Sequence, residues 1–210
     1  MNSKRILIAY GIISCIELFA AHSPVRYVTK PLLMIVLALY VMAIGLNASA
    51  RNTLLFILLF AWLGDVFLLL PGNSAVYFQL GLGSFLIMQM AYIRQFIKLG
   101  AWKFSYLVLP VIVYVGSFLG FLYPHLSASL LPPVVVYAFA LGAMLYFAFQ
   151  LRVTELSLGA FLFVVSDSLL AFGKFYFEYP WNSFAVMSTY ILAQLLLIYA
   201  LCKLHTQGKS

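Results

Sequence analysis

The amino-acid sequence predicts an all-α integral membrane bundle of eight transmembrane helices. The chain has 210 residues, of which 65% are hydrophobic and only 8% are charged, whereas soluble domains carry about 25% charged residues. The hydrophobic residues form eight runs spread over nearly the whole chain, each close to the ~20 residues that a helix needs to cross a bilayer. The runs are continuously apolar rather than alternating, which favours helices over a β-barrel.

Polar, charged and proline residues separate the eight runs. The runs cover residues 5–21, 30–46, 53–70, 75–96, 104–122, 130–150, 156–175 and 182–204. The first run follows Lys4 and Arg5, as in a signal peptide, but Glu17 interrupts it and no small-x-small cleavage site follows. We therefore expect a retained first span. The connections are too short for a soluble domain, so the sequence predicts one integral membrane domain over residues 1–210.

The formal charge of +7 is explained by membrane topology rather than by nucleic-acid binding, because the basic residues lie in short connections. Nine basic residues lie on the side of the termini, and three, Arg26, Lys30 and Lys174, lie on the other side. The nine are Lys4, Arg5, Arg51, Arg94, Lys98, Lys103, Arg152, Lys203 and Lys209. The positive-inside rule then predicts cytoplasmic termini. The short connections and compact length suggest a bacterial inner membrane.

Charged residues inside the runs point to a functional site. Asp65 lies in the third run and Asp167 in the seventh, and an ionised carboxylate at bilayer depth costs at least a few kcal/mol. The direction of each span puts both residues, and Glu17 of the first run, in the outer half of the membrane. Lys30 and Lys174 fall at the outer interface. The spacing therefore predicts that these five charges meet at one membrane level.

The surroundings of the two aspartates suggest an internal repeat. Gly64-Asp65-x-x-Leu68-Leu69 resembles Ser166-Asp167-x-x-Leu170-Ala171, 102 residues further along, and each is followed in the next run by a glutamine, Gln89 or Gln194. Two parallel halves of four spans would produce this pattern. Chance similarity between apolar helices is an equally good explanation.

Five short motifs, in order along the chain, resemble the YhhN/TMEM86 family of eight-span membrane proteins, whose characterised members are lysoplasmalogenases. One position departs from the family, which commonly has a histidine where this chain has Gln89. The motifs are Lys30-Pro31-Leu32, Leu63-Gly64-Asp65-Val66-Phe67-Leu68-Leu69, Phe78-x-x-Gly81-Leu82-x-x-Phe85-Leu86-x-x-x-x-x-Tyr92, Gly159-Ala160-x-Leu162-Phe163-x-x-Ser166-Asp167-Ser168, and Tyr190-x-x-Ala193-Gln194.

The resemblance implies hydrolysis of the vinyl ether bond of a lysoplasmalogen to a fatty aldehyde and glycerophospho-ethanolamine or -choline. This reaction needs an acid to protonate the alkene carbon and a base to activate water. Two carboxyl groups in one desolvated site can divide these tasks. Our hypothesis is that Asp65 and Asp167 are the catalytic pair, without an assignment of acid and base.

Five further residues are candidates for substrate binding. Lys30 could bind the substrate phosphate as a point charge or serve as an interfacial anchor. Glu17 could be a third carboxylate of the site or a partner for Lys30. Gln89, Tyr190 and Gln194 could contact substrate or join helices by hydrogen bonds. We expect Lys174 to be an interfacial anchor, and Gly81 and Gly83 to permit close helix contacts.

Two other classes of function remain open. Paired intramembrane carboxylates also suit a proton-coupled transporter of a small solute or lipid, although the chain is short and lacks clear Gly/Pro-broken spans. A lipid-binding or assembly protein would use the aspartates structurally.

Cys15 and Cys202 are far apart and offer no disulfide or metal-ligand spacing. We therefore expect no metal and no organic cofactor, with the bilayer and a lysophospholipid as partners.

Overall fold

The computed structural model describes residues 2–20, 23–70, 75–102 and 104–208, and none of these residues lies in a strand. Ala21, Lys103 and Lys209, which entered the expected spans and the charge count, lie outside the described residues. The α-helices are α1 (Ser3–Phe19), α2 (Arg26–Ala43), α3 (Ala48–Leu69), α4 (Ala75–Phe96), α5 (Val108–Leu122), α6 (Leu131–Gln150), α7 (Thr154–Phe175) and α8 (Asn182–Thr206). A π-helical turn, η1 (Ile97–Ala101), follows α4, and a 3-10 turn, η2 (Tyr123–His125), follows α5.

Length and composition make the chain a multi-pass membrane protein. Seven described helical segments, of 18 to 27 residues, are long and apolar enough to cross a bilayer. The remaining helix, α1, has 17 residues. The all-helical prediction is confirmed. The crossing of α1, the orientation and the repeat of four plus four spans stay predictions.

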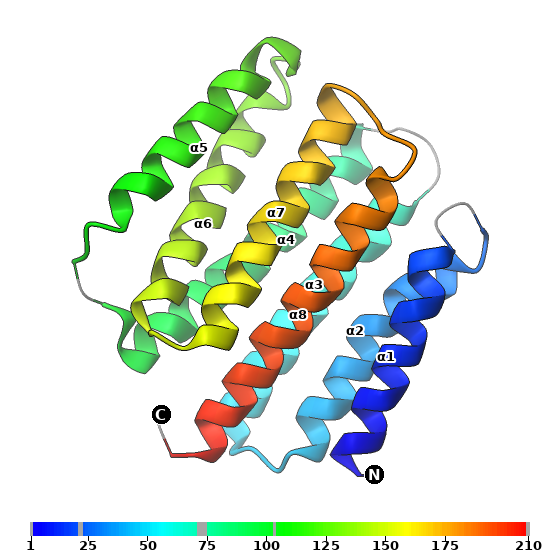
Figure 1. Ribbon diagram of the computed structural model, residues 1–210, viewed down its shortest axis with the longest axis vertical. Coiled ribbons are helices and arrows are strands. Elements are labelled where there is room, and N and C mark those ends of the chain that lie inside the picture. The colour runs from blue at the N-terminus through cyan, green and yellow to red at the C-terminus, as the bar shows by residue number, and fades with distance from the viewer. Residues whose placement is uncertain (1, 21–22, 71–74, 103, 209–210) are drawn as a thin grey trace.

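The helices form a bundle with both chain termini at one end, which we call the N/C end (Figure 1). Sequential hairpins supply the main contacts: α1 packs on α2, α3 on α4, and α7 on α8. Helix α8 also contacts α1 and α2, while α4 contacts α6. Helix α5 lies at the edge of the bundle, packs mainly against α6, and buries only Val115 and Leu122.

Two helices, α2 and α3, begin about one helical turn earlier than the sequence indicated. Helix α2 begins at Arg26, not at Lys30, so Pro31 lies inside the helix, where it cannot donate a backbone hydrogen bond. This early start places Arg26 and Lys30 one helical turn apart on α2. Helix α3 begins at Ala48, where the Asn47 side chain accepts the Ala50 N–H at 2.8 Å and caps the helix.

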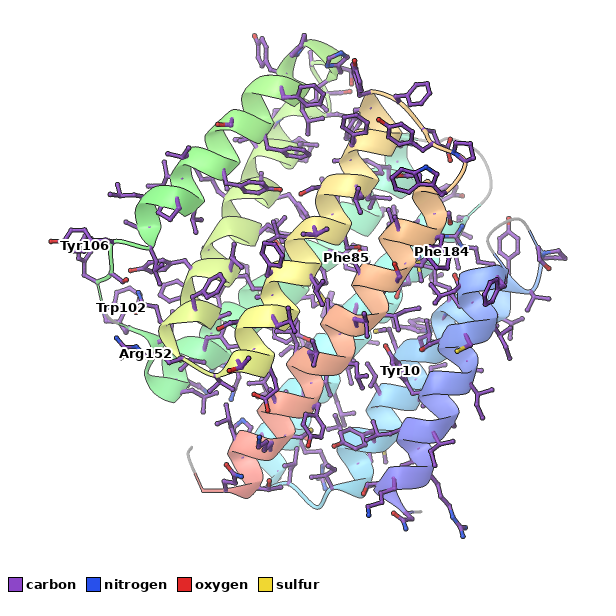
Figure 2. The ribbon with its side chains drawn as sticks, viewed as in Figure 1. Tyr10, Phe85, Trp102, Tyr106, Arg152 and Phe184 are labelled. Atoms are coloured by element: carbon purple, nitrogen blue, oxygen red, sulfur yellow. The ribbon has the colours of Figure 1, made fainter. Side chains whose placement is uncertain are left out.

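Two glycines allow α3 and α4 to approach closely. A Cβ atom added at Gly64 would lie 2.7 Å from the Phe85 ring, and one at Gly81 would lie 3.0 Å from Leu68 Cδ2. The expectation for Gly83 was wrong, because a Cβ there would meet open space. Phe85 accordingly lies well inside the bundle, in contrast to Tyr106, which projects at its edge (Figure 2).

Candidate functional site

Asp65 is the centre of a buried polar cluster that joins three helices. Its side chain, on α3, belongs to a residue that is 1% exposed. Lys30 of α2 places Nζ 3.4 Å from Oδ1. Tyr190 of α8 donates its hydroxyl to Oδ2 at 2.8 Å. The buried carboxylate is therefore matched by one cation and one phenol hydroxyl, as a buried charge requires.

Glu17 makes a second buried ion pair beside the first. Arg26 Nε lies 3.3 Å from Glu17 Oε1, and the Thr29 hydroxyl donates to Oε2. Glu17 is itself 1% exposed. Glu17 was considered as a partner for Lys30, but the ion pairs are different. Glu17 pairs with Arg26, and Lys30 pairs with Asp65.

Asp167 on α7 has different surroundings. Its Oδ2 accepts a hydrogen bond from the Tyr137 hydroxyl of α6. The ion pairs among the described residues join Arg26 to Glu17, Lys30 to Asp65 and Lys203 to Glu155, so none includes Asp167. Asp167 is therefore a half-buried carboxyl group with a phenol partner and no ion-pair partner in the described part of the chain.

Both aspartates line one cavity of about 200 Å³, which we call the carboxylate cavity. Helices α2, α3, α4, α7 and α8 supply its walls. Its polar wall residues are Arg26, Lys30, Asp65, Ser166, Asp167, Lys174 and Tyr190. Four of the five charges that the spacing placed at one membrane level, Lys30, Asp65, Asp167 and Lys174, thus meet at this wall, and Glu17 reaches it through Arg26.

A second, narrow cavity of about 60 Å³ lies between α4, α5, α6 and α7, and we call it the apolar pocket. Leu68, Phe78, Phe85, Asp167 and Leu170 line both spaces. Asp167 is the only carboxylate among these shared wall residues. It therefore stands where a polar cavity adjoins an apolar one.

The two candidate glutamines lie elsewhere. Gln194 accepts the Tyr92 hydroxyl at 3.0 Å and donates to Met88 Sδ at 3.4 Å, so it joins α8 to α4. Gln89 is 0% exposed, and neither of its amide atoms has a hydrogen-bond partner in the described structure. Neither glutamine is among the described residues that line the carboxylate cavity.

Sequence reasoning missed two residues of this region and misjudged a third. Arg26 lies four residues before Lys30, a spacing that places both on one helix face and could have identified it. Tyr137 gave no comparable indication, because the register between α6 and α7 cannot be read from apolar runs. Lys174, expected only as an anchor, lines the cavity with Nζ 5.4 Å from the centre of the Phe78 ring.

Among the described residues, metal ligands do not gather in this region. Across the described ranges, no three His, Cys, Asp or Glu side chains come close enough together to hold a metal ion. The donors that do converge are carboxylates, phenols and cations, which can exchange protons and bind an anion.

The fold and the cavity define a class: a multi-pass helical membrane protein with two carboxylates on the wall of one internal cavity. The model of the YhhN family matches residues 25–201, and the chain belongs to that family. It is 33% identical to lysoplasmalogenase TMEM86A of Bos taurus over 198 residues, covering 85% of this chain and 78% of the relative. The human TMEM86A is 32% identical over 191 residues, covering 84% and 78%.

A shorter match points the same way. Lysoplasmalogenase TMEM86B of Mus musculus is 38% identical over 82 residues, which cover 39% of this chain and 36% of the relative. No solved structure gives a significant match.

Proposed function

We propose that this protein is a lysoplasmalogenase-like hydrolase that cleaves the vinyl ether bond of a 1-alkenyl lysophospholipid. The products are a fatty aldehyde and glycerophospho-ethanolamine or -choline. One observation carries the proposal: two carboxylates with different partners line one cavity, and one of them also borders an apolar pocket. The names of the relatives support the same reaction.

The chemistry divides between an acid and a base. The acid protonates the alkene carbon farther from the ether oxygen, which leaves an oxocarbenium ion. Water adds to this ion while the base takes a proton from the water, giving a hemiacetal. The hemiacetal then collapses to aldehyde: its hydroxyl proton returns to the first carboxylate, and the second carboxyl gives its proton to the departing glycerol oxygen. Both carboxyl groups end in their starting forms, and one water is consumed.

Asp167 is our choice for the acid and Asp65 for the base. The Lys30 ammonium, 3.4 Å from Asp65, offsets a negative charge on that carboxylate. Asp167 has no such cation among the described residues and borders apolar surface, where a neutral carboxyl group costs less than a charged one. Its Oδ2 accepts from Tyr137, so the proton would sit on Oδ1.

The cations of the cavity suit the phosphodiester of the substrate. Arg26, Lys30 and Lys174 all reach its wall, and a guanidinium group can bind two phosphate oxygens at once. Glu17 fixes Arg26 through the 3.3 Å ion pair, so we assign Glu17 a positioning role rather than a catalytic one. We assign Lys30 mainly to the charge of Asp65 rather than to the phosphate, because the ion pair with Asp65 is already formed.

Aldehyde release tests the proposal. Purified, detergent-solubilised protein is given 1-alkenyl-2-lyso-glycerophosphoethanolamine, with the 1-acyl compound as the control for ester hydrolysis. We expect aldehyde from the wild type only with the vinyl ether, and none from Asp65→Asn or Asp167→Asn. A folded, active Asp167→Asn would contradict the carboxylate pair. No release from folded wild type, together with proton flux in liposomes that Asp65→Asn abolishes, would favour a transporter instead.

We also propose that the N/C end of the bundle faces the cytoplasm, as the excess of Lys and Arg at that end supports. The test is the reactivity of an introduced cysteine, in place of Ser3 or of Ser129, toward an impermeant thiol reagent in intact cells. Labelling at position 129 but not at position 3 is expected. The reverse pattern would overturn the orientation.

A further inference from the structure

We propose that the part of the apolar pocket beyond Asp167, toward the N/C end, holds the hydrocarbon chain of the substrate, and that Leu145 at its end sets the accepted chain length. This inference rests on the proposed function for the identity of the ligand, a single-chain phospholipid. It goes further in assigning the site of the chain and the residue that limits its length.

The order of groups along the bundle supports this placement. Lys30 lies near the start of α2 and Lys174 near the end of α7, and both lie toward the end of the bundle away from the termini. Asp65 and Asp167 come next. Val164 precedes Asp167 by nearly one turn of α7, and Leu145 on α6 continues the pocket toward the N/C end. The pocket also extends past Leu170 and Phe175 toward the opposite end. On the N/C side of Asp167, the order of cations, carboxylates and apolar surface matches phosphate, ether and chain in one lipid.

The pocket adjoins the carboxylate cavity. Phe85, Leu170 and Asp167 belong to both walls, so side chains rather than a helix separate an ether at Asp167 from a chain in the pocket. From Tyr137, the partner of Asp167, to Leu145 is eight residues of α6, or about 12 Å of helix. The α6 side of the wall is therefore long enough to lie along a large part of an extended hydrocarbon chain.

Close contact between α5 and α6 narrows the pocket near its N/C end. A Cβ atom at Gly142 would lie 2.8 Å from Val115 Cγ2 and 3.1 Å from Val111 Cγ1, so the two helices touch there. Leu145 lies one turn beyond Gly142 on α6 and is buried. Because α6 contributes no lining residue beyond Leu145, the size of this side chain decides how far a chain can extend.

The test compares chain lengths in two opposite variants. Leu145→Trp shortens the pocket and Leu145→Ala lengthens it. For Leu145→Trp we expect kcat/KM for a hexadecenyl lysophospholipid to fall by roughly tenfold or more relative to an octenyl one, since a methylene in a filled apolar pocket is worth about tenfold or more. Leu145→Ala should move the ratio in the opposite direction. The control is Phe139→Trp, which introduces the same residue on α6 at a position that is 58% exposed and lines neither space.

Failure of this inference is distinguishable from failure of the proposed function. Binding of uncleavable hexadecyl and octyl ether lysophospholipids is measured in parallel as the rise in Tm that each ligand causes. If no vinyl ether is cleaved but Leu145→Trp selectively loses stabilisation by the hexadecyl ligand, the chain site stands and the reaction is wrong. If both chain lengths lose activity and binding equally, or the ratio does not change, the chain site is wrong.

Discussion

Asp65 and Asp167 occupy similar stretches of sequence and very different surroundings. Asp65 is 1% exposed, ion-paired with Lys30 and bonded to Tyr190 at the junction of three helices. Asp167 is half-buried, has Tyr137 as its hydrogen-bond partner, and borders the apolar pocket. The difference teaches that neighbouring helices, rather than the local motif, decide which partners a membrane carboxylate meets.

The largest expected effect separates the two aspartates by stability. Asp65→Asn leaves the Lys30 ammonium buried without its partner, and breaking one side of a buried ion pair costs about 3–5 kcal/mol. Asp167→Asn removes no ion pair, so its unfolding free energy should stay within about 1 kcal/mol of wild type. Both variants should lose aldehyde release. Denaturant unfolding in detergent, beside the activity assay, checks both expectations.

A double substitution sharpens this result. Asp65→Asn combined with Lys30→Met removes both charges and should recover most of the lost stability, because well-packed apolar groups can replace a buried ion pair. Activity should not return. Recovery of activity together with stability would mean that Asp65 is structural, and the comparison between the two aspartates would then reduce to folding alone.

The next effect concerns the phenol partners. Tyr137→Phe removes the hydrogen bond that the Tyr137 hydroxyl donates to Asp167, and we expect kcat to fall by about tenfold, equivalent to about 1.4 kcal/mol. Tyr190→Phe leaves Asp65 with Lys30 and should lower kcat by only about threefold. Steady-state kinetics on the two variants decides the matter. Equal losses would contradict different roles for the two carboxylates.

Much of the fold follows from the sequence, because an apolar run of bilayer length forms a helix, which satisfies its own backbone hydrogen bonds in lipid. The helix starts were harder to predict. Pro31 suggests a first helical position, which proline favours, yet α2 begins at Arg26, and both Arg26 and Thr29 contact Glu17. The early start decides which cation reaches which carboxylate.

The membrane depth of the candidate site residues could be predicted from the sequence, but their interaction partners could not. Counting residues along each span placed Asp65 and Asp167 at similar depth, and the structure brings both to one cavity. Their partners depend on the rotation of one helix against the next, which packing of side chains such as Phe85 sets. For that reason neither Tyr137 as the partner of Asp167 nor the position of Gln89 off the cavity wall could be read from the sequence.

The last prediction concerns packing and tests the residue that precedes Asp65, which differs from the residue that precedes Asp167. Ser166 donates its hydroxyl to the Val186 carbonyl of α8 at 3.0 Å, whereas Gly64 leaves room for the Phe85 ring of α4. Gly64→Ala places a Cβ 2.7 Å from that ring and should cost about 1–3 kcal/mol of unfolding free energy. Gly83→Ala, on α4 and with open space around it, is the matched control and gains the same helix propensity of about 1 kcal/mol without the clash.

Thermal unfolding of the two glycine variants in detergent measures the difference. We expect Gly64→Ala to lower Tm and Gly83→Ala to leave it unchanged or raise it. Because Phe85 lines both the carboxylate cavity and the apolar pocket, the clash should also lower aldehyde release by the Gly64 variant. A Gly64→Ala protein as stable and as active as Gly83→Ala would mean that Phe85 moves aside freely. The close packing of α3 on α4 would then not be what positions Asp65.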